Sequence, residues 1–327
     1  MKGMNRFAPA FLALSVFGLC SAASAAGYPE RPIKIVTPYA AGGSTDYLAR
    51  LVAQRLSDRL GQPVVVENKP GASEQIAAVA VARNSAPDGY TLMLTTTAGL
   101  AINPGLYGSS LQYDPQKDFA PIIPAAAVPS LVVVNPSVPA KTFQELTAYI
   151  KANPGKLSYA SAGVGTPSHL GMELYKRAAG LDIVHVPFKG GAPAIQSIVA
   201  EQVQVMMPVM SEAMPMTKAA KLKALAVASS EPLPQYPGLP TVSDAGLKGF
   251  GLDLYYVFVA PIKTPRDVVA KLNAEINAVL KEPDTRQKIQ ENGLNVLGGS
   301  ASALADMVAR DIPKYKQVIE AANIKLD

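Results

Sequence analysis

Cysteine, histidine and tryptophan are almost missing from this chain of 327 residues, which has one cysteine, two histidines and no tryptophan. Cys20 lies in an N-terminal segment that has the features of an export signal, so the mature chain is expected to have no thiol. A chain without thiols cannot form disulfides, cysteine metal sites or a cysteine nucleophile. His169 and His185 lack the local spacing of a metal-binding pair, and we expect no metal site.

Long hydrophobic runs are also missing. The apolar stretch 7–19 follows Lys2 and Arg6 and precedes Ala23-Ser24-Ala25, a small-residue cleavage site. It is shorter than the roughly 20 residues that span a bilayer. We therefore interpret residues 1–25 as a signal peptide that is removed from a soluble, exported protein.

Clusters of basic residues are missing as well. Removal of Lys2 and Arg6 lowers the formal net charge from +5 to +3, and the other basic residues are scattered. We expect no nucleic-acid partner on this ground, because proteins that bind nucleic acids need a clustered basic face.

Nucleotide and nucleophile motifs are incomplete or lacking. Gly163-Val164-Gly165 begins like a dinucleotide fingerprint, but Ser168 stands where the third glycine belongs. Neither a phosphate-binding loop nor a Gly-x-Ser-x-Gly nucleophile elbow occurs. We expect no cofactor and no catalytic residues.

Two glycine-rich loops are the most informative features that the chain does have. Residues 38–46 follow an apolar strand and lead into a helix, and residues 160–171 repeat this arrangement. In the second loop Thr166 suits the N-cap and Pro167 the first helical position. A strand, a glycine turn and a helix start together can bind a small anion, although the same pattern fits an ordinary strand-to-helix connection equally well.

Strands alternate with helices along the mature chain, which predicts an α/β fold with mainly parallel sheets. Pro104 and Pro115 should break any helix within 103–119, and Pro313 should kink or split the last helix. The predicted strands are 33–37, 64–67, 90–95, 131–134, 157–159, 183–186, 203–207, 222–228 and 254–260. The predicted helices are 48–60, 74–83, 142–152, 167–178, 194–200, 265–280 and 302–322.

The two glycine loops lie in different halves of the chain, at the carboxyl ends of strands where open α/β sheets bind ligands. Facing each other, they would form a cleft between two domains that close about a hinge. Asp46 could cap its helix or contact the ligand, His169 could orient its loop or line the pocket, and His185 should be structural. Tyr39 and Phe188 could wall the pocket or pack in the core.

The chain resembles the substrate-binding receptors of tripartite tricarboxylate transporters, the Bug family, over essentially the whole mature sequence. The resemblance lies in several segments, which are Tyr28-Pro29-Glu30-Arg31-Pro32-Ile33, residues 38–46, residues 61–72, Pro87-Asp88-Gly89-Tyr90-Thr91-Leu92, residues 161–170 and residues 185–191.

This resemblance implies a two-domain periplasmic-binding-protein ("Venus flytrap") fold, with residues 27–127 and 253–327 in one domain and 128–252 in the other. It implies a monomeric periplasmic receptor that delivers a small organic acid to the membrane components of a tripartite transporter. It implies that backbone N–H groups, hydroxyls and waters hold the ligand carboxylate. The ligand-binding residues that we predict are Tyr39, Gly43, Ser44, Thr45, Asp46, Ser161, Ala162, Gly165, Thr166, His169, Phe188 and Pro208.

Three departures from the family pattern stand out. Pro208 replaces a frequent aspartate, no tryptophan lies near Tyr255-Tyr256, and residues 71–74 read Gly-Ala-Ser-Glu where the family has more glycine. Because proline has no charge to pair with an ammonium group, we expect a dicarboxylate or an aromatic acid in preference to an amino acid. The alternative is that position 208 does not reach the pocket and that its proline only shapes a turn.

Two alternatives stay open. An exported hydrolase of small esters or amides would need a nucleophile within reach of a base, and the sequence has no such arrangement. A receptor that serves a sensor kinase instead of a transporter would have the same sequence features.

Overall fold

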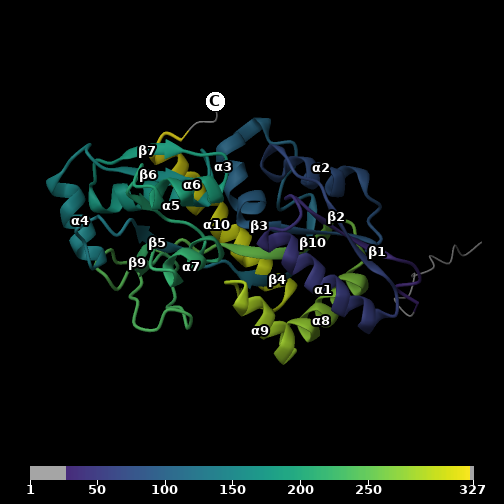
Figure 1. The fold of residues 1–327 in the computed structure, drawn as a ribbon. Coiled ribbons are helices and arrows are strands. Elements are labelled where there is room, and N and C mark those ends of the chain that lie inside the picture. Colours follow the sequence, from purple (N-terminus) through teal and green to yellow (C-terminus); the bar gives the residue numbers. More distant parts are fainter. Residues whose placement is uncertain (1–26, 325–327) are drawn as a thin grey trace, which may run out of the picture.

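Two β-sheets, each covered by helices, form two lobes in the computed structural model, which describes residues 27–324 (Figure 1). The predicted signal peptide, residues 1–25, lies outside the described residues. None of the helices within 27–324 has both the length and the apolar character that crossing a bilayer requires.

The first lobe is built on a six-stranded sheet in the order β11-β4-β10-β3-β1-β2. Its strands are β1 (Ile33–Thr37), β2 (Val64–Asn68), β3 (Thr91–Thr96), β4 (Phe119–Ala127), β10 (Tyr255–Pro261) and β11 (Asn295–Val296). Its helices are α1 (Ser44–Leu60), α2 (Gln75–Asn84), α3 (Asn103–Tyr107), α8 (Arg266–Lys281), α9 (Pro283–Glu291) and α10 (Ala301–Ala321), with short turns of 3₁₀-helix at Ala72–Glu74 and Gly108–Ser110 and of π-helix at Ala98–Ile102.

The second lobe is built on a five-stranded sheet in the order β7-β6-β8-β5-β9. Its strands are β5 (Leu131–Val134), β6 (Ser158–Ser161), β7 (Val184–Pro187), β8 (Val205–Met206) and β9 (Lys223–Val227). Its helices are α4 (Phe143–Ala152), α5 (Pro167–Ala179), α6 (Gly191–Val199) and α7 (Met210–Lys218). We propose to divide the chain between the lobes at 127/128 and 252/253, as the sequence predicts.

Both sheets are mixed, whereas the sequence predicts mainly parallel ones. The strands that alternate with helices pair in parallel, namely β1 with β2 and β3, and β6 with β7 and β8. The strands next to the crossings between lobes, β4, β5, β9, β10 and β11, pair antiparallel. The antiparallel pairs arise because β10 returns from the second lobe and runs beside β4, which leads into it.

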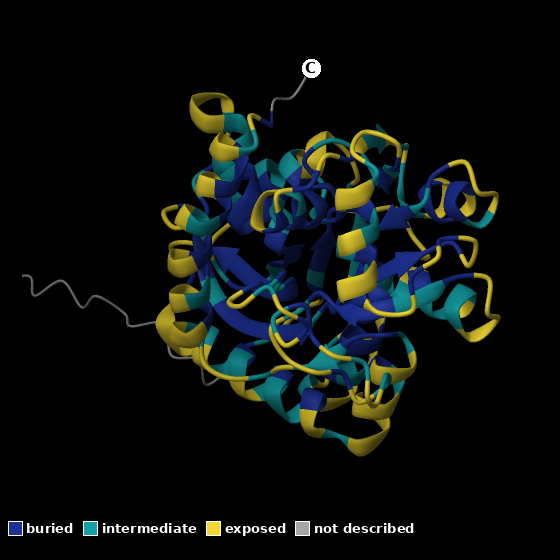
Figure 2. Cartoon of the chain, turned by 90° about the vertical axis from the view of Figure 1, so that its left-hand side faces the viewer, coloured by how far each residue is buried: buried dark blue, intermediate teal, exposed yellow. Residues whose placement is uncertain are grey.

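The core follows from the hydrophobic pattern of the elements. All four residues of β5 and all seven of β10 are buried, as expected for strands covered on both faces. Leu48, Val52 and Leu56 lie four residues apart in α1 and are completely buried on its sheet-facing side. Figure 2 shows the same arrangement, with buried sheets inside and exposed residues along the outer faces of the helices.

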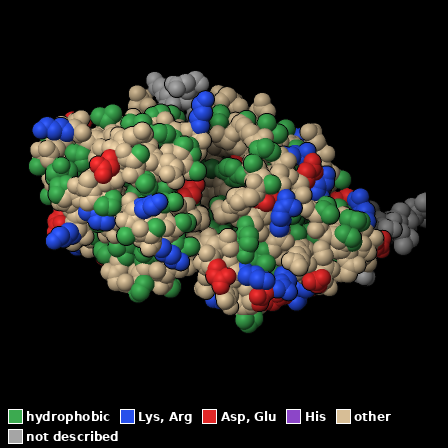
Figure 3. Space-filling model, in the orientation of Figure 1, with side chains coloured by type: hydrophobic (Ala, Val, Ile, Leu, Met, Phe, Trp, Pro, Cys, Tyr) green, Lys and Arg blue, Asp and Glu red, His purple; other side chains and the backbone are tan. Residues whose placement is uncertain are grey.

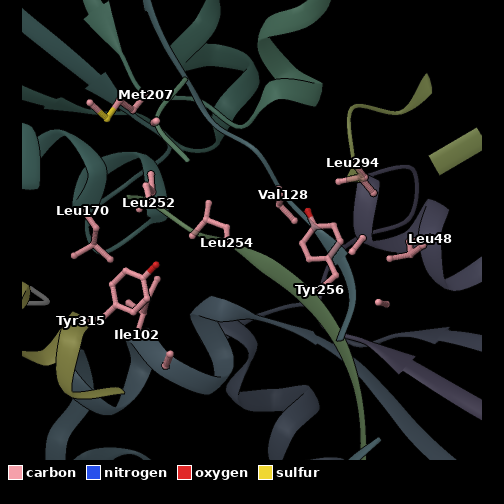
Figure 4. Packing of buried hydrophobic residues seen from close by; sticks show 14 of the residues in the cluster. Leu48, Ile102, Val128, Leu170, Met207, Leu252, Leu254, Tyr256, Leu294 and Tyr315 are labelled. Carbon is pink, nitrogen blue, oxygen red and sulfur yellow. The ribbon is translucent and has the colours of Figure 1, made fainter. Parts of the chain in front are cut away.

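Two adjacent segments connect the lobes. Val128 N–H donates to Leu254 O (2.8 Å), so the outgoing and returning chains are hydrogen-bonded to each other, and Leu252 N–H of the returning chain donates to Ala228 O (2.9 Å) at the end of β9. Apolar residues of one continuous cluster surround these crossings, including Val128, Leu252, Leu254, Tyr256 and Tyr315 (Figure 4). The lobes are therefore joined by a narrow but well-packed hinge.

Helix α10 braces this hinge. Lys314 donates its Nζ proton to Gly251 O (2.8 Å), and the Tyr315 hydroxyl donates to Asp253 O (3.1 Å). The same helix reaches the second lobe, where Arg177 of α5 donates to Ala321 O. A third connection thus accompanies the two crossing strands.

The structure corrects two predictions about proline. Pro104 lies in the first turn of α3, where its missing N–H costs no hydrogen bond, so the region 103–119 contains a short helix. Pro313 lies inside α10, which remains one helix over 21 residues. Packing of the buried Tyr315 and Ile319 against the first lobe compensates for the lost hydrogen bond.

Candidate ligand cleft

A cleft of about 770 Å³ lies between the two lobes and is visible as a hollow in the space-filling view (Figure 3). Its volume is in the range of small-molecule sites. Residues of both lobes line it, among them Tyr39, Gly42, Gly43, Ser44, Thr45, Thr96, Tyr255 and Tyr256 of the first lobe and Ala162, Thr166, Pro167, Ser168, Gly190, Gly191, Ser211 and Glu212 of the second.

Helices from both lobes begin at this cleft. The first residues of α1 and its N-cap Gly43, of α5 with Thr166, and of α6 with Gly190 all belong to the lining. No side chain caps these three helices, in contrast to α4 and α10, whose N-caps Thr142 and Ser300 bind their own helix. The N–H groups and the positive dipole ends of α1, α5 and α6 thus face the space where a ligand would lie.

Asp46 fixes the loop that precedes α1. Its carboxylate accepts hydrogen bonds from Gly42 N–H (3.0 Å), Arg50 Nε (3.0 Å) and Asn68 Nδ2 (2.9 Å). Burial alone would raise the pKa of the Asp46 carboxyl, but these hydrogen bonds outweigh it and hold the pKa below its usual range. Asp46 therefore stays ionised behind the loop, where Gly42 has a positive φ of 93° that only glycine adopts without strain.

The second loop is held by Ser161 and Ser168. Ser161 Oγ donates to Gly163 O and accepts from Gly163 N–H, each at 3.1 Å, and Ala162 N–H donates to Ser168 Oγ (3.0 Å). Gly165 has a φ of 74° and lies so close to Leu106 of the first lobe that a Cβ would be 2.6 Å from its Cδ1. A larger residue fits at Gly165 only if the Leu106 side chain, α3 or the loop moves.

Both histidines support this loop from behind. His169 Nδ1 accepts a hydrogen bond from Gly165 N–H (3.0 Å), and His185 Nε2 bonds Ser161 Oγ (2.7 Å). The two rings stack with centroids 4.0 Å apart, and Tyr159 stacks on His185 at 4.8 Å. Burial lowers the pKa of His169, and burial together with His169 lowers the pKa of His185 to about 4. Both rings are neutral at pH 7.

A buried carboxylate, Glu74, lies behind the opposite wall. It accepts hydrogen bonds from the hydroxyls of Tyr39 (2.8 Å), Thr95 (2.6 Å) and Thr96, and from Thr96 N–H (3.3 Å). Burial raises the pKa of the Glu74 carboxyl in spite of these donors. Glu74 thereby orients Tyr39 and Thr96, two residues of the cleft lining.

The predicted site residues fall into two groups. Tyr39, Gly43, Ser44, Thr45, Ala162 and Thr166 line the cleft. The others lie outside the lining, since Asp46, Ser161, Gly165 and His169 stabilise the two loops, Phe188 packs against the core of the second lobe, and the buried Pro208 pairs with β5 through its carbonyl, which accepts from Leu131 N–H (3.1 Å).

Several lining residues were not among those predicted. Thr96 comes from the end of β3, Gly190 and Gly191 from the start of α6, and Glu212 from α7, whereas Tyr255 and Tyr256, which could line the cleft according to the sequence, do so. The Gly190-Gly191 pair precedes a helix, as the glycines of the other two loops do, and could have been predicted on the same ground. Nothing in the local pattern around Glu212 indicates a cleft position.

The charges of the lining are unusual for a site that faces helix N-termini. Among the described residues that line the cleft, Glu212 and Glu291 carry the formal charges, and lysine, arginine and histidine are absent. Within residues 27–324 no group of histidine, cysteine, aspartate or glutamate side chains is arranged to hold a metal ion. An anionic group in the cleft would have to be bound by N–H groups and hydroxyls.

Residues 48–324 match the model of the tripartite tricarboxylate transporter family receptor. The chain belongs to this receptor family. It is 32% identical to Protein BugT of Bordetella pertussis over 314 residues, which cover 96% of each chain.

Solved structures of this receptor family agree with the assignment. Rpa4515 of R. palustris with adipate is 34% identical, with a TM-score of 0.82 over 91% of this chain and 99% of that one. MatC from Rhodopseudomonas palustris with bound malate is also 34% identical, with a TM-score of 0.77 over 89% of this chain and 100% of that one. The receptor thus has the two-lobed fold of the periplasmic binding proteins, as its sequence predicts.

Proposed function

We propose that this chain is a periplasmic receptor that captures a small organic carboxylate in the cleft and delivers it to the membrane components of a tripartite tricarboxylate-type transporter. The observation that carries the proposal is the arrangement of α1, α5 and α6, which begin at one cleft from two lobes without side-chain caps. The receptor family and the periplasmic relatives support the location and the partner.

The ligand carboxylate accepts hydrogen bonds from first-turn N–H groups and from the hydroxyls of Ser44 and Thr45, whereas the Thr166 hydroxyl donates to Gly163 O (2.6 Å) and holds its own loop. Ser44 Oγ lies 2.7 Å from the Tyr256 hydroxyl, which keeps its orientation fixed. Ser161 and His169 act through the loop that they hold. Because neither loop contains arginine, the carboxylate is bound without a bidentate guanidinium clamp.

Binding and closure are coupled in this proposal. The donors come from both lobes, so a ligand satisfies all of them only when the lobes approach about the hinge at 128–130 and 251–254. The receptor acts as a monomer and performs no reaction on its ligand.

Within the carboxylates we propose a dicarboxylate or an aromatic acid ahead of an amino acid. The adipate and malate named for the two Rhodopseudomonas structures support a dicarboxylate. The bodies of Tyr39, Tyr255 and Tyr256 in the lining offer apolar surface to a carbon chain or a ring.

A thermal-shift screen of organic acids against the mature chain tests the proposal. A ligand at 100 times its dissociation constant should add about 2.7 kcal/mol to the free energy of unfolding. Calorimetry with the pairs succinate and aspartate, and a benzene dicarboxylate and an aromatic amino acid, then ranks the classes. Absence of stabilisation by every acid of the screen, or turnover of generic esters, would contradict a carboxylate receptor.

A further inference from the structure

The Glu212 carboxylate lies in the cleft without a hydrogen-bond partner among the described residues. Glu212 belongs to the first turn of α7, where a carboxylate is favoured by the helix dipole. Its side chain, however, extends across to α6. A Cβ on Gly191 would lie 2.2 Å from both carboxylate oxygens, so only glycine at this position leaves room for them.

The surroundings of Glu212 do not compensate its charge. The groups that face it are the N-terminal backbone of α6 at Gly190 and Gly191 and the Tyr256 hydroxyl, and Glu291 of α9 lines the same cleft from the first lobe. Glu212 is exposed to the cleft, while the protein atoms around its carboxyl partly desolvate it and raise its pKa to about 7. Above this pH the carboxyl is ionised and offers acceptors only, and the described residues use none of them.

We propose that Glu212 accepts a hydrogen bond from a donor on the ligand, a hydroxyl or an ammonium group, while the helix N-termini hold the ligand's carboxylate. This inference rests on the function proposed above and narrows its ligand class to small carboxylates that carry such a donor. The cleft can therefore bind a carboxylate through N–H groups at one end and a hydrogen-bond donor through the unpaired Glu212 carboxylate at the other.

In this proposal Glu212, and not Pro208, determines which class of carboxylate the cleft selects. Pro208 is buried in the sheet and is not part of the lining, whereas Glu212 is in it. A hydroxyl and an ammonium offer the same hydrogen bond to Glu212, and they differ in charge. If the ammonium is preferred, the order of dicarboxylates and amino acids proposed above is reversed, and carboxylate capture is unaffected.

Calorimetry with succinate, malate and aspartate tests the role of Glu212, because these acids share a carbon skeleton and differ in having no donor, a hydroxyl or an ammonium. We expect malate or aspartate to bind roughly tenfold or more tightly than succinate, as a hydrogen bond to a charged group implies. Glu212→Gln should remove most of this difference and leave the affinity for succinate equal or higher. Glu231→Gln, which removes an exposed charge outside the cleft, should change neither.

The outcomes separate the inference from the proposed function. Equal affinity of the unchanged protein for all three acids, or an equal loss for all three in Glu212→Gln, would overturn the inference while carboxylate capture stands. Failure of every carboxylate to bind would refute both.

Discussion

Glu74 combines complete burial with an irregular backbone. It ends a run of left-handed residues, Ala72, Ser73 and Glu74, with φ of 46°, 49° and 76°. Non-glycine residues adopt this conformation at a cost, which the hydrogen bonds to the carboxylate offset. The same carboxylate fits because Gly99 has no side chain, since a Cβ there would lie 2.5 Å from Glu74 Oε2.

We expect Glu74→Ala to lower the free energy of unfolding by about 2–4 kcal/mol, because it leaves a cavity and buried hydroxyls without an acceptor. Glu74→Gln keeps the shape and one acceptor oxygen and should lose less. Urea denaturation measures both. If the two variants were equally stable, the hydroxyl network would contribute nothing to the stability of the lobe.

His185 makes the stability depend on pH. Its folded pKa of about 4 is below the ordinary 6.5, so the unfolded chain takes up the proton first as the pH falls. The stabilising contribution of the neutral ring is complete above pH 6.5 and is lost between pH 6.5 and about 4. Because the ring is half-buried, we expect this loss to be about 1–2 kcal/mol.

Denaturation at several pH values between 7 and 4 measures this effect. His185→Asn, which does not titrate, should show a shallower decline than the unchanged protein. Parallel curves for the two proteins would mean that other groups, His169 and carboxylates, cause the decline.

The sequence predicts the role of a site residue where that role depends on its neighbours in the chain. The loops before α1 and α5 were recognisable because glycine, a hydroxyl residue and proline have defined roles at a helix start. Glu74 and Glu212 were not, because their importance depends on what lies opposite them. Gly99 and Gly191 make room for these carboxylates from distant parts of the chain, and no spacing rule connects the partners.

Among the elements, α5 has a left-handed glycine near each end, so two alanine substitutions can be compared to test whether the loop between β6 and α5 positions the ligand. Gly165 and Gly180 lie at the two ends of α5 with φ of 74° and 61°, but only at Gly165 would an added Cβ meet other atoms within 4 Å. We expect each change to alanine to cost about 1 kcal/mol of stability for the left-handed backbone. Only Gly165→Ala should also weaken ligand binding, because it shifts the N–H groups at the start of α5.

Thermal melts and calorimetry with an acid from the screen distinguish the two variants. Equal affinity in Gly165→Ala and Gly180→Ala would show that the loop position does not matter for the ligand.

Helices with regular patterns could be predicted closely, such as α1, and so could the buried strand β5. Strand β4 was missed because Pro121 and Pro124 argue against a strand. In the structure these prolines pair with β10 at register shifts, where a missing N–H is tolerated. Helix α7 was missed because Pro215 lies inside it. Which strands pair, and in which direction, depends on the lobe crossings and not on local pattern.

For the whole molecule, closure about the hinge should make the receptor more compact when a ligand binds. Small-angle scattering should show a smaller radius of gyration after addition of an acid that the screen identifies. An unchanged radius at saturation would contradict hinge closure.

A contact between the lobes beside the hinge can be tested in the same way. Gly293, which follows α9 and has a φ of 73°, approaches α7 so closely that a Cβ would lie 3.0 Å from the Ser211 backbone. Gly293→Ala should therefore favour an open form with a larger radius and weaker binding. Gly238→Ala, with a φ of 84° and open space around it, should behave like the unchanged protein. Equal radii in the two variants would show that this contact does not limit opening.

The uncapped starts of α1, α5 and α6 have a consequence for how such a receptor changes over evolutionary time. A main-chain N–H survives the replacement of its own side chain by every amino acid except proline. Substitutions in the lining can therefore alter which molecule is chosen while the donors for its acidic group persist. Receptors that descend from one ancestral gene could therefore gain new ligand specificities by a few substitutions at positions such as 212, while the N–H groups that bind the carboxylate stay unchanged.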